Sequence, residues 1–200
     1  MKKWTKLSIS RLPMGHEMTS TPLQMVMAMS AIANRGVLMH PMMVDRLEDE
    51  HGRIIAKYPP VAVRRVTSEK AARDMVTALK SVVTSSGTAE KAQLENYTVA
   101  GKTGTAQKPI NGQYVKGKYF SSFIGFFPAD NPELCISVVF DEPKSGSYYG
   151  GQTAAPVFQR IAERSANYLQ IPPDILPEDS RSGSLRGEVP ARSLAATKNN

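Results

Sequence analysis

Two nearly continuous apolar runs, residues 119–127 and 134–140, constrain the fold of this chain more than any other feature. A short turn with a proline at each end, residues 128–132, joins them. Apolar runs of this length between turn residues are typical of strands that are covered on both faces. A third strand is expected at residues 97–106. We therefore predict an α/β fold of the α+β kind, in which helices flank an antiparallel sheet.

Helical periodicity predicts three helices around these strands. The first begins at Thr21-Pro22, where threonine can cap free N–H groups, and the second follows Thr67-Ser68. The third ends before Pro172. The apolar stripes of the second and third helices are Ala72, Met75, Val76, Leu79, Val82 and Val83, and Val157, Phe158, Ile161, Tyr168 and Leu169. Each stripe is expected to form the buried face of its helix.

The segment between the first two helices is expected to be extended and to contain a hairpin. Residues 37–47 form an extended run that Pro41 interrupts, and residues 48–52 form a charged turn. Several methionines lie in or near this segment: Met25, Met27, Met29, Met39, Met42 and Met43. Methionine fills irregular gaps in cores, so these side chains are expected to be packed inside the protein.

The charge pattern and the scarcity of metal-binding side chains exclude several functions. The chain has a net charge of +7 and a pI near 9.5, but its basic residues are scattered and are not interleaved with aromatic residues. We therefore expect a solvated basic surface and no nucleic-acid partner. The three histidines are widely separated, and the single cysteine, Cys135, lies in an apolar run where a buried thiol is expected. No metal and no cofactor are predicted.

Two further expectations concern membranes and the end of the chain. No stretch approaches the roughly 20 apolar residues that a membrane-spanning helix needs, so no membrane segment is predicted in this chain. From residue 172 onward, proline, serine, glycine and arginine dominate and periodicity vanishes. We therefore expect one folded unit over residues 1–171 and a tail over residues 172–200 that lacks fixed structure.

The stretch VAGKTGTA, residues 99–106, contains a short motif with a clear chemical meaning. In a strand, Gly104 would let a peptide approach the backbone closely, because glycine has no Cβ. Lys102 would place a positive charge beside that cleft, where it attracts a carboxylate and stabilises a developing oxyanion. Side chains alternate along a strand, so Lys102 and Gly104 are expected on one face and Thr103 and Thr105 on the other.

A phosphate-binding loop is the alternative interpretation of Gly101-Lys102-Thr103. Such a loop needs a further glycine at position 96, where this chain has Asn96, and residues 97–99 are expected to form a strand. A nucleotide site is therefore not expected.

Together with four other stretches, the Lys-Thr-Gly motif resembles the class B penicillin-binding proteins over residues 4–170. The stretches are Gly15 with Thr21-Pro22-Leu23-Gln24, Ala33-Asn34-Arg35-Gly36, Gly87-Thr88-Ala89, residues 100–106, and Gly150-Gly151 with Ala154-Ala155-Pro156-Val157-Phe158. The division and spore-septum members are the most similar. The resemblance implies a penicillin-binding transpeptidase-like fold and a cell-wall D,D-transpeptidase, with an N-terminal membrane anchor and a catalytic domain on the periplasmic or external face.

The resemblance also implies roles for individual residues. Lys102 would be the catalytic lysine of the active-site strand, and the backbone N–H of Thr105 would complete an oxyanion hole. Thr103, Gly104 and the hydroxyl of Thr105 would bind substrate, with Tyr149 as a further contact. The implied substrates are peptidoglycan stem peptides that end in D-Ala-D-Ala, and β-lactams mimic them. Division-machinery proteins are further expected partners.

The sequence departs from the family at the nucleophile. The family pairs Lys-Thr-Gly with an earlier S-x-x-K motif that carries the attacking serine, yet no serine here has a lysine three residues later. The second motif, S-x-N, is matched only by Ser165-Ala166-Asn167, which follows Lys102 and is expected on the surface of the last helix. We therefore expect residues 1–171 to be the C-terminal part of a transpeptidase domain that is inactive alone. The alternative is a non-catalytic relative that binds stem peptides or division partners.

Overall fold

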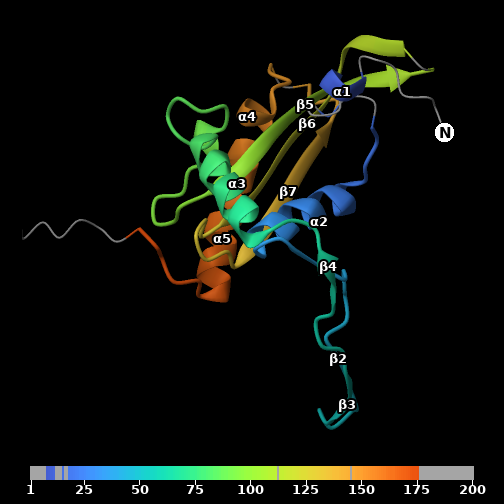
Figure 1. The fold of residues 1–200 in the computed structure, drawn as a ribbon, viewed down its shortest axis with the longest axis vertical. Helices are drawn as coiled ribbons and strands as arrows, with labels where there is room; N and C mark the ends of the chain where they lie inside the picture. Colours follow the sequence, from blue (N-terminus) through green and yellow to red (C-terminus); the bar gives the residue numbers. More distant parts are fainter. Residues whose placement is uncertain (1–7, 12–14, 16–17, 112, 145, 176–200) are drawn as a thin grey trace, which may run out of the picture.

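A three-stranded antiparallel sheet in the order β5-β6-β7 forms the centre of the protein (Figure 1). The computed structural model describes residues 8–11, 15, 18–111, 113–144 and 146–175. The strands are β5 (Ala100–Ile110), β6 (Gln113–Phe127) and β7 (Leu134–Asp141), and the long helices are α2 (Pro22–Ala33), α3 (Glu69–Ser81) and α5 (Ala155–Leu169). Helices α2 and α3 cover one face of the sheet and α5 covers the other. The predicted antiparallel sheet flanked by helices is confirmed.

β6 is the central strand, and its side chains alternate between two hydrophobic layers. Phe123 and Phe127 pack on one face with Phe158 of α5. Phe126 packs on the other face with Leu79 of α3. Because both faces are covered, this strand needs no alternation of polar and apolar residues, as its sequence indicates.

The buried face of α5 differs from the predicted stripe. Phe158 is buried as expected. In contrast, Ile161, Tyr168 and Leu169 are 41%, 87% and 54% exposed, so the prediction is wrong at these positions. The remaining buried residues of the helix are Ala155, Ala162 and Ala166. Small side chains let a helix pack close to a sheet, so the contact face here consists of three alanines with Phe158.

Capping side chains begin the two helices of the other layer. Thr21 accepts a hydrogen bond from the N–H of Gln24, and the Gln24 side chain accepts one from the N–H of Thr21. Ser68 accepts a hydrogen bond from the N–H of Ala71 at the start of α3. Both predicted starts are confirmed. Met75, which was expected on the buried stripe of α3, is 48% exposed, because it lies at the border of that stripe.

Residues 37–65 form an arm that projects away from the sheet (Figure 1). It consists of two antiparallel ribbons, whose strands are β1 (Val37–Met39) with β4 (Ala62–Arg65), and β2 (Arg46–Glu48) with β3 (Ile54–Lys57). Asp49 holds the turn between β2 and β3, because its side chain accepts hydrogen bonds from the N–H groups of His51 and Arg53. The predicted hairpin is confirmed.

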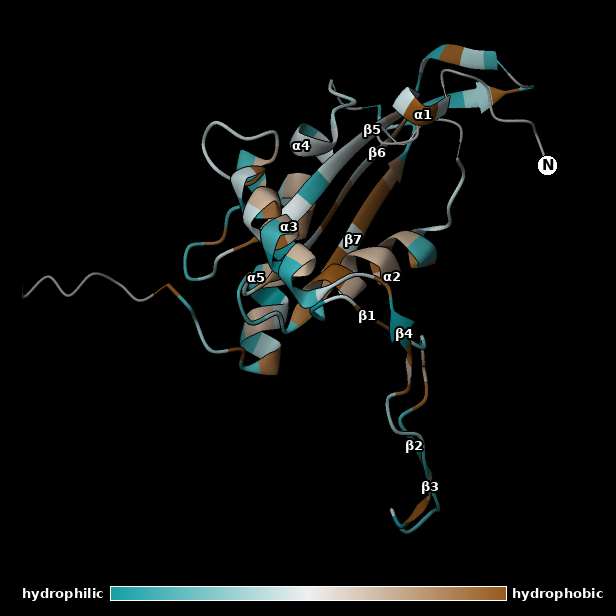
Figure 2. Cartoon of the chain, viewed as in Figure 1, coloured by the Kyte–Doolittle hydropathy of each residue, from teal (hydrophilic) through white to brown (hydrophobic). Residues whose placement is uncertain are grey.

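Several methionines expected in the core lie on the surface. Met25 is 44%, Met42 42% and Met43 102% exposed, whereas Met29 packs against the core between α2 and the sheet. Figure 2 shows hydrophobic residues along β7, inside the fold, and also on the projecting arm. The two arm methionines are exposed because no other layer of the described structure covers the arm.

The end of the described chain is fastened to the residues before β5. Asp174 accepts a hydrogen bond from the N–H of Thr98 at 2.7 Å and another from the Thr98 hydroxyl. Ile171 is buried in the core beside α5. Of the tail predicted over residues 172–200, residues 176–200 lie outside the described part of the chain.

Candidate functional site

The motif at residues 102–105 lies on β5, at the edge of the sheet. The antiparallel register with β6 places Lys102 opposite Ile124 and Thr105 opposite Ser121. Among the described residues, no strand pairs with the other edge of β5. Backbone groups along an unpaired strand edge can form hydrogen bonds with an extended peptide, so this edge can bind one.

The side chains of the motif alternate as predicted. Thr103 and Thr105 face the layer that contains α4 (Gly150–Thr153). Gly104 faces the side chain of Ser122, because a Cβ at Gly104 would lie 2.4 Å from the Ser122 hydroxyl oxygen. Lys102 shares this second face and is exposed.

The first turn of α4 orients the hydroxyl of Thr105. The hydroxyl oxygen accepts a hydrogen bond from the N–H of Gly150 at 3.2 Å. A hydroxyl that accepts one bond still has its own proton to donate to a second partner. A Cβ on Gly150 would lie 2.2 Å from the carbonyl oxygen of Ser122, so only glycine lets α4 lie this close to the sheet.

Thr103 is held by the turn that follows α3. The hydroxyl oxygens of Thr103 and Thr88 lie 3.0 Å apart and share a hydrogen bond. Gly151 packs over the same turn, because a Cβ there would lie 2.0 Å from the carbonyl oxygen of Thr88. Thr103 therefore contributes to the packing of the domain, and its contact with substrate stays a prediction.

Lys102 presents a positive charge at the edge of the sheet. Its Nζ donates a hydrogen bond to the carbonyl oxygen of Thr103 at 2.8 Å. No carboxylate in the described ranges forms an ion pair with Lys102, whereas other lysines of the chain have such partners. A cation without a carboxylate partner attracts an anionic ligand more strongly than a paired one does.

Tyr149 belongs to a row of three tyrosines next to α4. The rings of Tyr119 and Tyr148 stack with their centres 4.2 Å apart, and those of Tyr148 and Tyr149 lie 4.5 Å apart. The hydrogen bond with Tyr148, together with the charge on that neighbour, raises the pKa of Tyr149. Tyr149 is 56% exposed, so its ring is accessible to a ligand beside the motif.

The sequence marks Thr88 and Gly150 only as parts of family-like stretches, with Gly150 in a loop that can flank the cleft, and it gives no role to Ser121. In the structure all three support the motif or its neighbours. The Ser121 hydroxyl donates a hydrogen bond to the carbonyl oxygen of Tyr148 and so fixes the tyrosine row to β6. These contacts join distant parts of the chain, and no spacing in the sequence reveals them. The glycine pair Gly150-Gly151 is the one usable signal, since consecutive glycines often mark a close approach between backbones.

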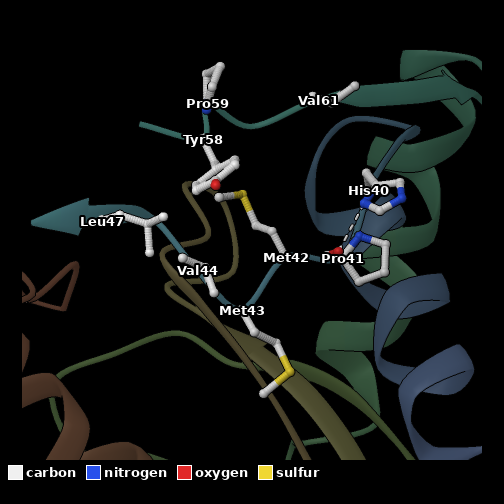
Figure 3. Close-up of a pocket in the computed structure, with 9 residues that line it drawn as sticks. All are labelled: His40, Pro41, Met42, Met43, Val44, Leu47, Tyr58, Pro59 and Val61. Atoms are coloured by element: carbon white, nitrogen blue, oxygen red, sulfur yellow. Dashed lines mark hydrogen bonds between the residues drawn. The ribbon is translucent and has the colours of Figure 1, made fainter. Parts of the chain in front are cut away.

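A hollow of about 530 Å³ lies on the arm (Figure 3), which projects away from β5 (Figure 1). Its walls are His40, Pro41, Met42, Met43, Val44, Leu47, Tyr58, Pro59 and Val61. These walls carry no carboxylate, lysine or serine, so they lack the serine and lysine that the resembled family uses for acyl transfer. The candidate site is therefore the Lys-Thr-Gly strand.

The described ranges offer neither a membrane helix nor a metal centre. None of their helices combines the length and the hydrophobicity needed to cross a bilayer. Within the same ranges, no three His, Cys, Asp or Glu residues gather into a possible metal site. Burial raises the pKa of the Cys135 thiol, which disfavours the thiolate form that binds metals.

Comparison with known families decides which family this strand and its supports belong to. Residues 1–163 match the family described as "Penicillin binding protein transpeptidase domain". The chain belongs to the penicillin-binding protein transpeptidase family. This membership confirms the resemblance inferred from the Lys-Thr-Gly motif and its companion stretches.

Two curated relatives carry names that state a process or an activity. Stage V sporulation protein D of Bacillus subtilis (strain 168) is 39% identical over 160 residues, which is 80% of this chain and 25% of that protein. Peptidoglycan D,D-transpeptidase FtsI of Escherichia coli (strain K12) is 31% identical over 176 residues, which is 88% of this chain and 28% of that protein. The chain thus spans about a quarter of the length of these relatives.

Solved structures of transpeptidases share the fold. The transpeptidase domain of penicillin-binding protein 3 from Burkholderia pseudomallei, in its apo form, gives a TM-score of 0.74 at 34% identity over 88% of this chain and 50% of that one. Penicillin-binding protein 3 from Mycobacterium tuberculosis, in complex with ampicillin, gives 0.76 at 31% identity over 88% of this chain and 41% of that one. The predicted penicillin-binding transpeptidase-like fold is confirmed.

Proposed function

We propose that this chain supplies the Lys-Thr-Gly side of the active site of a peptidoglycan D,D-transpeptidase, which cross-links stem peptides through an acyl-serine intermediate and binds penicillin. One observation carries the proposal: Lys102, without a carboxylate partner in the described ranges, lies on a strand with one unpaired edge, and the same strand carries the Thr105 hydroxyl, whose oxygen accepts a hydrogen bond from the N–H of Gly150. The names of the curated relatives, which include peptidoglycan D,D-transpeptidases, support it.

The geometry of β5 suggests how a stem peptide binds. An extended peptide that ends in D-Ala-D-Ala adds to the free edge of β5, where Gly104 and Thr103 leave the backbone accessible. Its terminal carboxylate accepts a hydrogen bond from the Thr105 hydroxyl and is attracted by Lys102. The backbone N–H of Thr105 stabilises the oxyanion that forms on the penultimate carbonyl. The exposed ring of Tyr149 contacts the side of the bound peptide.

The attacking serine belongs, in this proposal, to polypeptide that carries the S-x-x-K and S-x-N motifs, neither of which the present sequence offers in the required order. The serine oxygen forms a bond with the penultimate D-Ala carbonyl carbon, and the terminal D-Ala leaves as a free amine that takes up a proton. An amine of a neighbouring stem peptide then displaces the serine oxygen, which recovers a proton. A β-lactam enters the same path but remains bound to the serine.

The surroundings of this activity follow from the same proposal. Stem peptides lie outside the cytoplasm, so the site works on the periplasmic or extracytoplasmic side of the cell membrane. Division-machinery proteins are its expected partners, because the sequence motifs resemble those of the division and spore-septum members of the family. A non-catalytic module that binds stem peptides or division partners is the second candidate, and the lack of any S-x-x-K sequence favours it.

Fluorescent penicillin separates the two candidates. The full chain is co-expressed with a polypeptide that carries the S-x-x-K half of a class B transpeptidase domain, and the purified pair is labelled. We expect covalent label on the serine-bearing partner only when this chain is present, and we expect Lys102→Ala to abolish it. Lys116→Ala, at an exposed position on β6, is the matched control and is expected to label normally.

Two results would contradict the transpeptidase proposal. Label that is insensitive to Lys102→Ala would show that this lysine does not serve the reaction. An assembled wild-type pair that never labels, yet binds a D-Ala-D-Ala peptide, would favour the non-catalytic module.

A further inference from the structure

A largely buried lysine on the motif strand lies in a charge cluster outside the motif. The Nζ of Lys108 donates hydrogen bonds to Oδ1 of Asp141 at 2.6 Å and to Oε1 of Glu142 at 2.9 Å. Its side chain is only 18% exposed, and Nζ lies 4.8 Å from the centre of the Phe120 ring. Lys118 adds a longer ion pair with Glu142 at 3.5 Å. Lys108 therefore joins β5 to the end of β7, although these two strands do not pair with each other.

Glu142 follows the last residue of β7, where the segment that leads to α4 begins. Its backbone has a φ of 50°, in the left-handed region that residues with a Cβ rarely adopt. Its N–H donates a hydrogen bond to the carbonyl oxygen of Tyr119 at 2.9 Å, and Lys108 holds its carboxylate. Such contacts are needed to maintain an unfavourable backbone conformation, and here they set the direction in which the segment leaves the sheet.

The other end of this segment is fastened beside the motif. Tyr148 stacks on Tyr119 at 4.2 Å, and the N–H of Gly150 donates its hydrogen bond to the hydroxyl oxygen of Thr105. The segment is therefore tied at both of its ends, at Glu142 and at Gly150. At each end, one of the contacts is a hydrogen bond with a side chain of β5: Lys108 at Glu142 and Thr105 at Gly150.

We propose that Lys108 is a positioning residue, which holds residues 142–144 and 146–150 against the Lys-Thr-Gly strand and so keeps Thr105 and Tyr149 where they meet substrate. The inference rests on the proposed function where it treats these two residues as substrate contacts. The hydrogen bonds that hold the segment at Glu142 and Gly150 do not depend on that function. Lys108 acts through Glu142 and touches neither substrate nor reacting atoms. Loss of its charge leaves two neighbouring carboxylates to repel each other and releases the start of the segment.

Hydrogen exchange on the full 200-residue chain tests, without any catalytic assay, whether Lys108 holds the segment between β7 and α4. Lys108→Met keeps an apolar stem over Phe120 but removes the charge, whereas Lys108→Arg keeps the charge. Lys116→Met removes an exposed lysine from the same hairpin and is the control. We expect the Gly150 amide to exchange about tenfold faster in Lys108→Met than in the control, and near the wild-type rate in Lys108→Arg. The Phe126 amide, in the core, is expected to be unchanged in all three variants.

Two exchange results overturn the proposal. Equal exchange at Gly150 in Lys108→Met and Lys116→Met shows that the cluster does not hold the segment. An equal rise at Gly150 and at Phe126 in Lys108→Met shows that Lys108 stabilises the whole domain and does not position one segment.

Penicillin labelling of the assembled pair adds a second readout. We expect Lys108→Met to weaken reversible penicillin binding about threefold to tenfold, while the maximal labelling rate stays within about twofold of the wild-type rate. The opposite split, with binding intact and the maximal rate lowered, contradicts a positioning role. If the wild-type pair does not label, the proposed function fails, and the exchange measurement still decides whether the tie exists.

Discussion

The backbone N–H of Gly150 and the hydroxyl oxygen of Thr105 lie 3.2 Å apart and join the first turn of α4 to the Lys-Thr-Gly strand. This contact orients the Thr105 hydroxyl from the side of the sheet where α4 lies. Among the described residues, one edge of the strand stays open to a ligand. A change that moves α4 is therefore expected to alter the site without touching any residue of the motif.

Gly150→Ala is expected to destabilise the protein by about 3 kcal/mol, because overpacking against backbone cannot relax easily. The added Cβ would meet the carbonyl oxygens of Ser122 at 2.2 Å and Gly104 at 2.6 Å. Gly104→Ala is the matched control, since its Cβ meets the Ser122 hydroxyl, a side-chain atom that can rotate away. Urea denaturation measures both variants. Equal losses would contradict the close packing of α4 on the sheet.

Lys102→Ala is expected to separate stability from activity. Lys102 is exposed, so its removal is expected to change the free energy of unfolding by no more than about 0.5 kcal/mol. The same variant is expected to lose penicillin labelling in the assembled pair. Urea denaturation and labelling are measured on one preparation. A large loss of stability would mean that Lys102 serves the fold and would weaken its assignment to the site.

Glu142 is expected to make stability depend on pH in the acid range. The hydrogen bond from Lys108 lowers the pKa of Glu142, and the charges of Lys108 and Lys118 act in the same direction. A carboxyl group with a lowered folded-state pKa stabilises the fold above its unfolded pKa of about 4.3, and this contribution is lost as pH falls through the folded value. We therefore expect the stability gap between wild type and Glu142→Gln to shrink below about pH 4.

Urea midpoints of both proteins at several pH values between neutral and acid test this dependence. Glu163→Gln, on the exposed side of α5, is the control and is expected to follow the wild type. A gap between wild type and Glu142→Gln that is constant over the whole range would show that the Lys108 cluster makes no charge-dependent contribution.

Asp174→Ala is expected to lower stability by about 1 to 2 kcal/mol, because Asp174 satisfies both the N–H and the hydroxyl of Thr98. Thr98 in turn accepts a hydrogen bond from the N–H of Ala129 at 3.0 Å, so the loss extends to the turn before β7. Asp174→Asn keeps an acceptor oxygen and is expected to lose less. Thermal unfolding ranks the variants, and indistinguishable midpoints would show that this contact contributes nothing.

Local signals in the sequence were sufficient for much of the fold. The capping residues Thr21 and Ser68 located the starts of two helices, and the proline-bounded turn at residues 128–132 separated β6 from β7. These features act over a few residues, so sequence spacing reveals them. The buried face of α5 was predicted only in part, at Val157 and Phe158, because Ala162 and Ala166 carry little hydrophobic signal and are buried only when the helix packs against a sheet.

The alternation of the motif side chains was predictable, whereas the contacts that support the motif were not. The alternation of Lys102 and Thr103 follows from strand geometry alone, and the structure confirms it. The contacts of Thr103 with Thr88 and of Thr105 with Gly150 depend on how distant segments meet. Side chains such as these have no periodic relation to the motif, so only the three-dimensional arrangement identifies them.

The two fastenings on either side of the motif, at Thr98 just before β5 and at Lys108 on β5, limit which insertions and deletions the protein tolerates. Removing one residue between them would exchange the faces of Lys102 and Thr103, because side chains alternate along a strand. The tip of the hairpin between β5 and β6 lies beyond both fastenings. Engineers who want to insert a reporter peptide near the site should therefore lengthen this tip and leave the strand at its natural length.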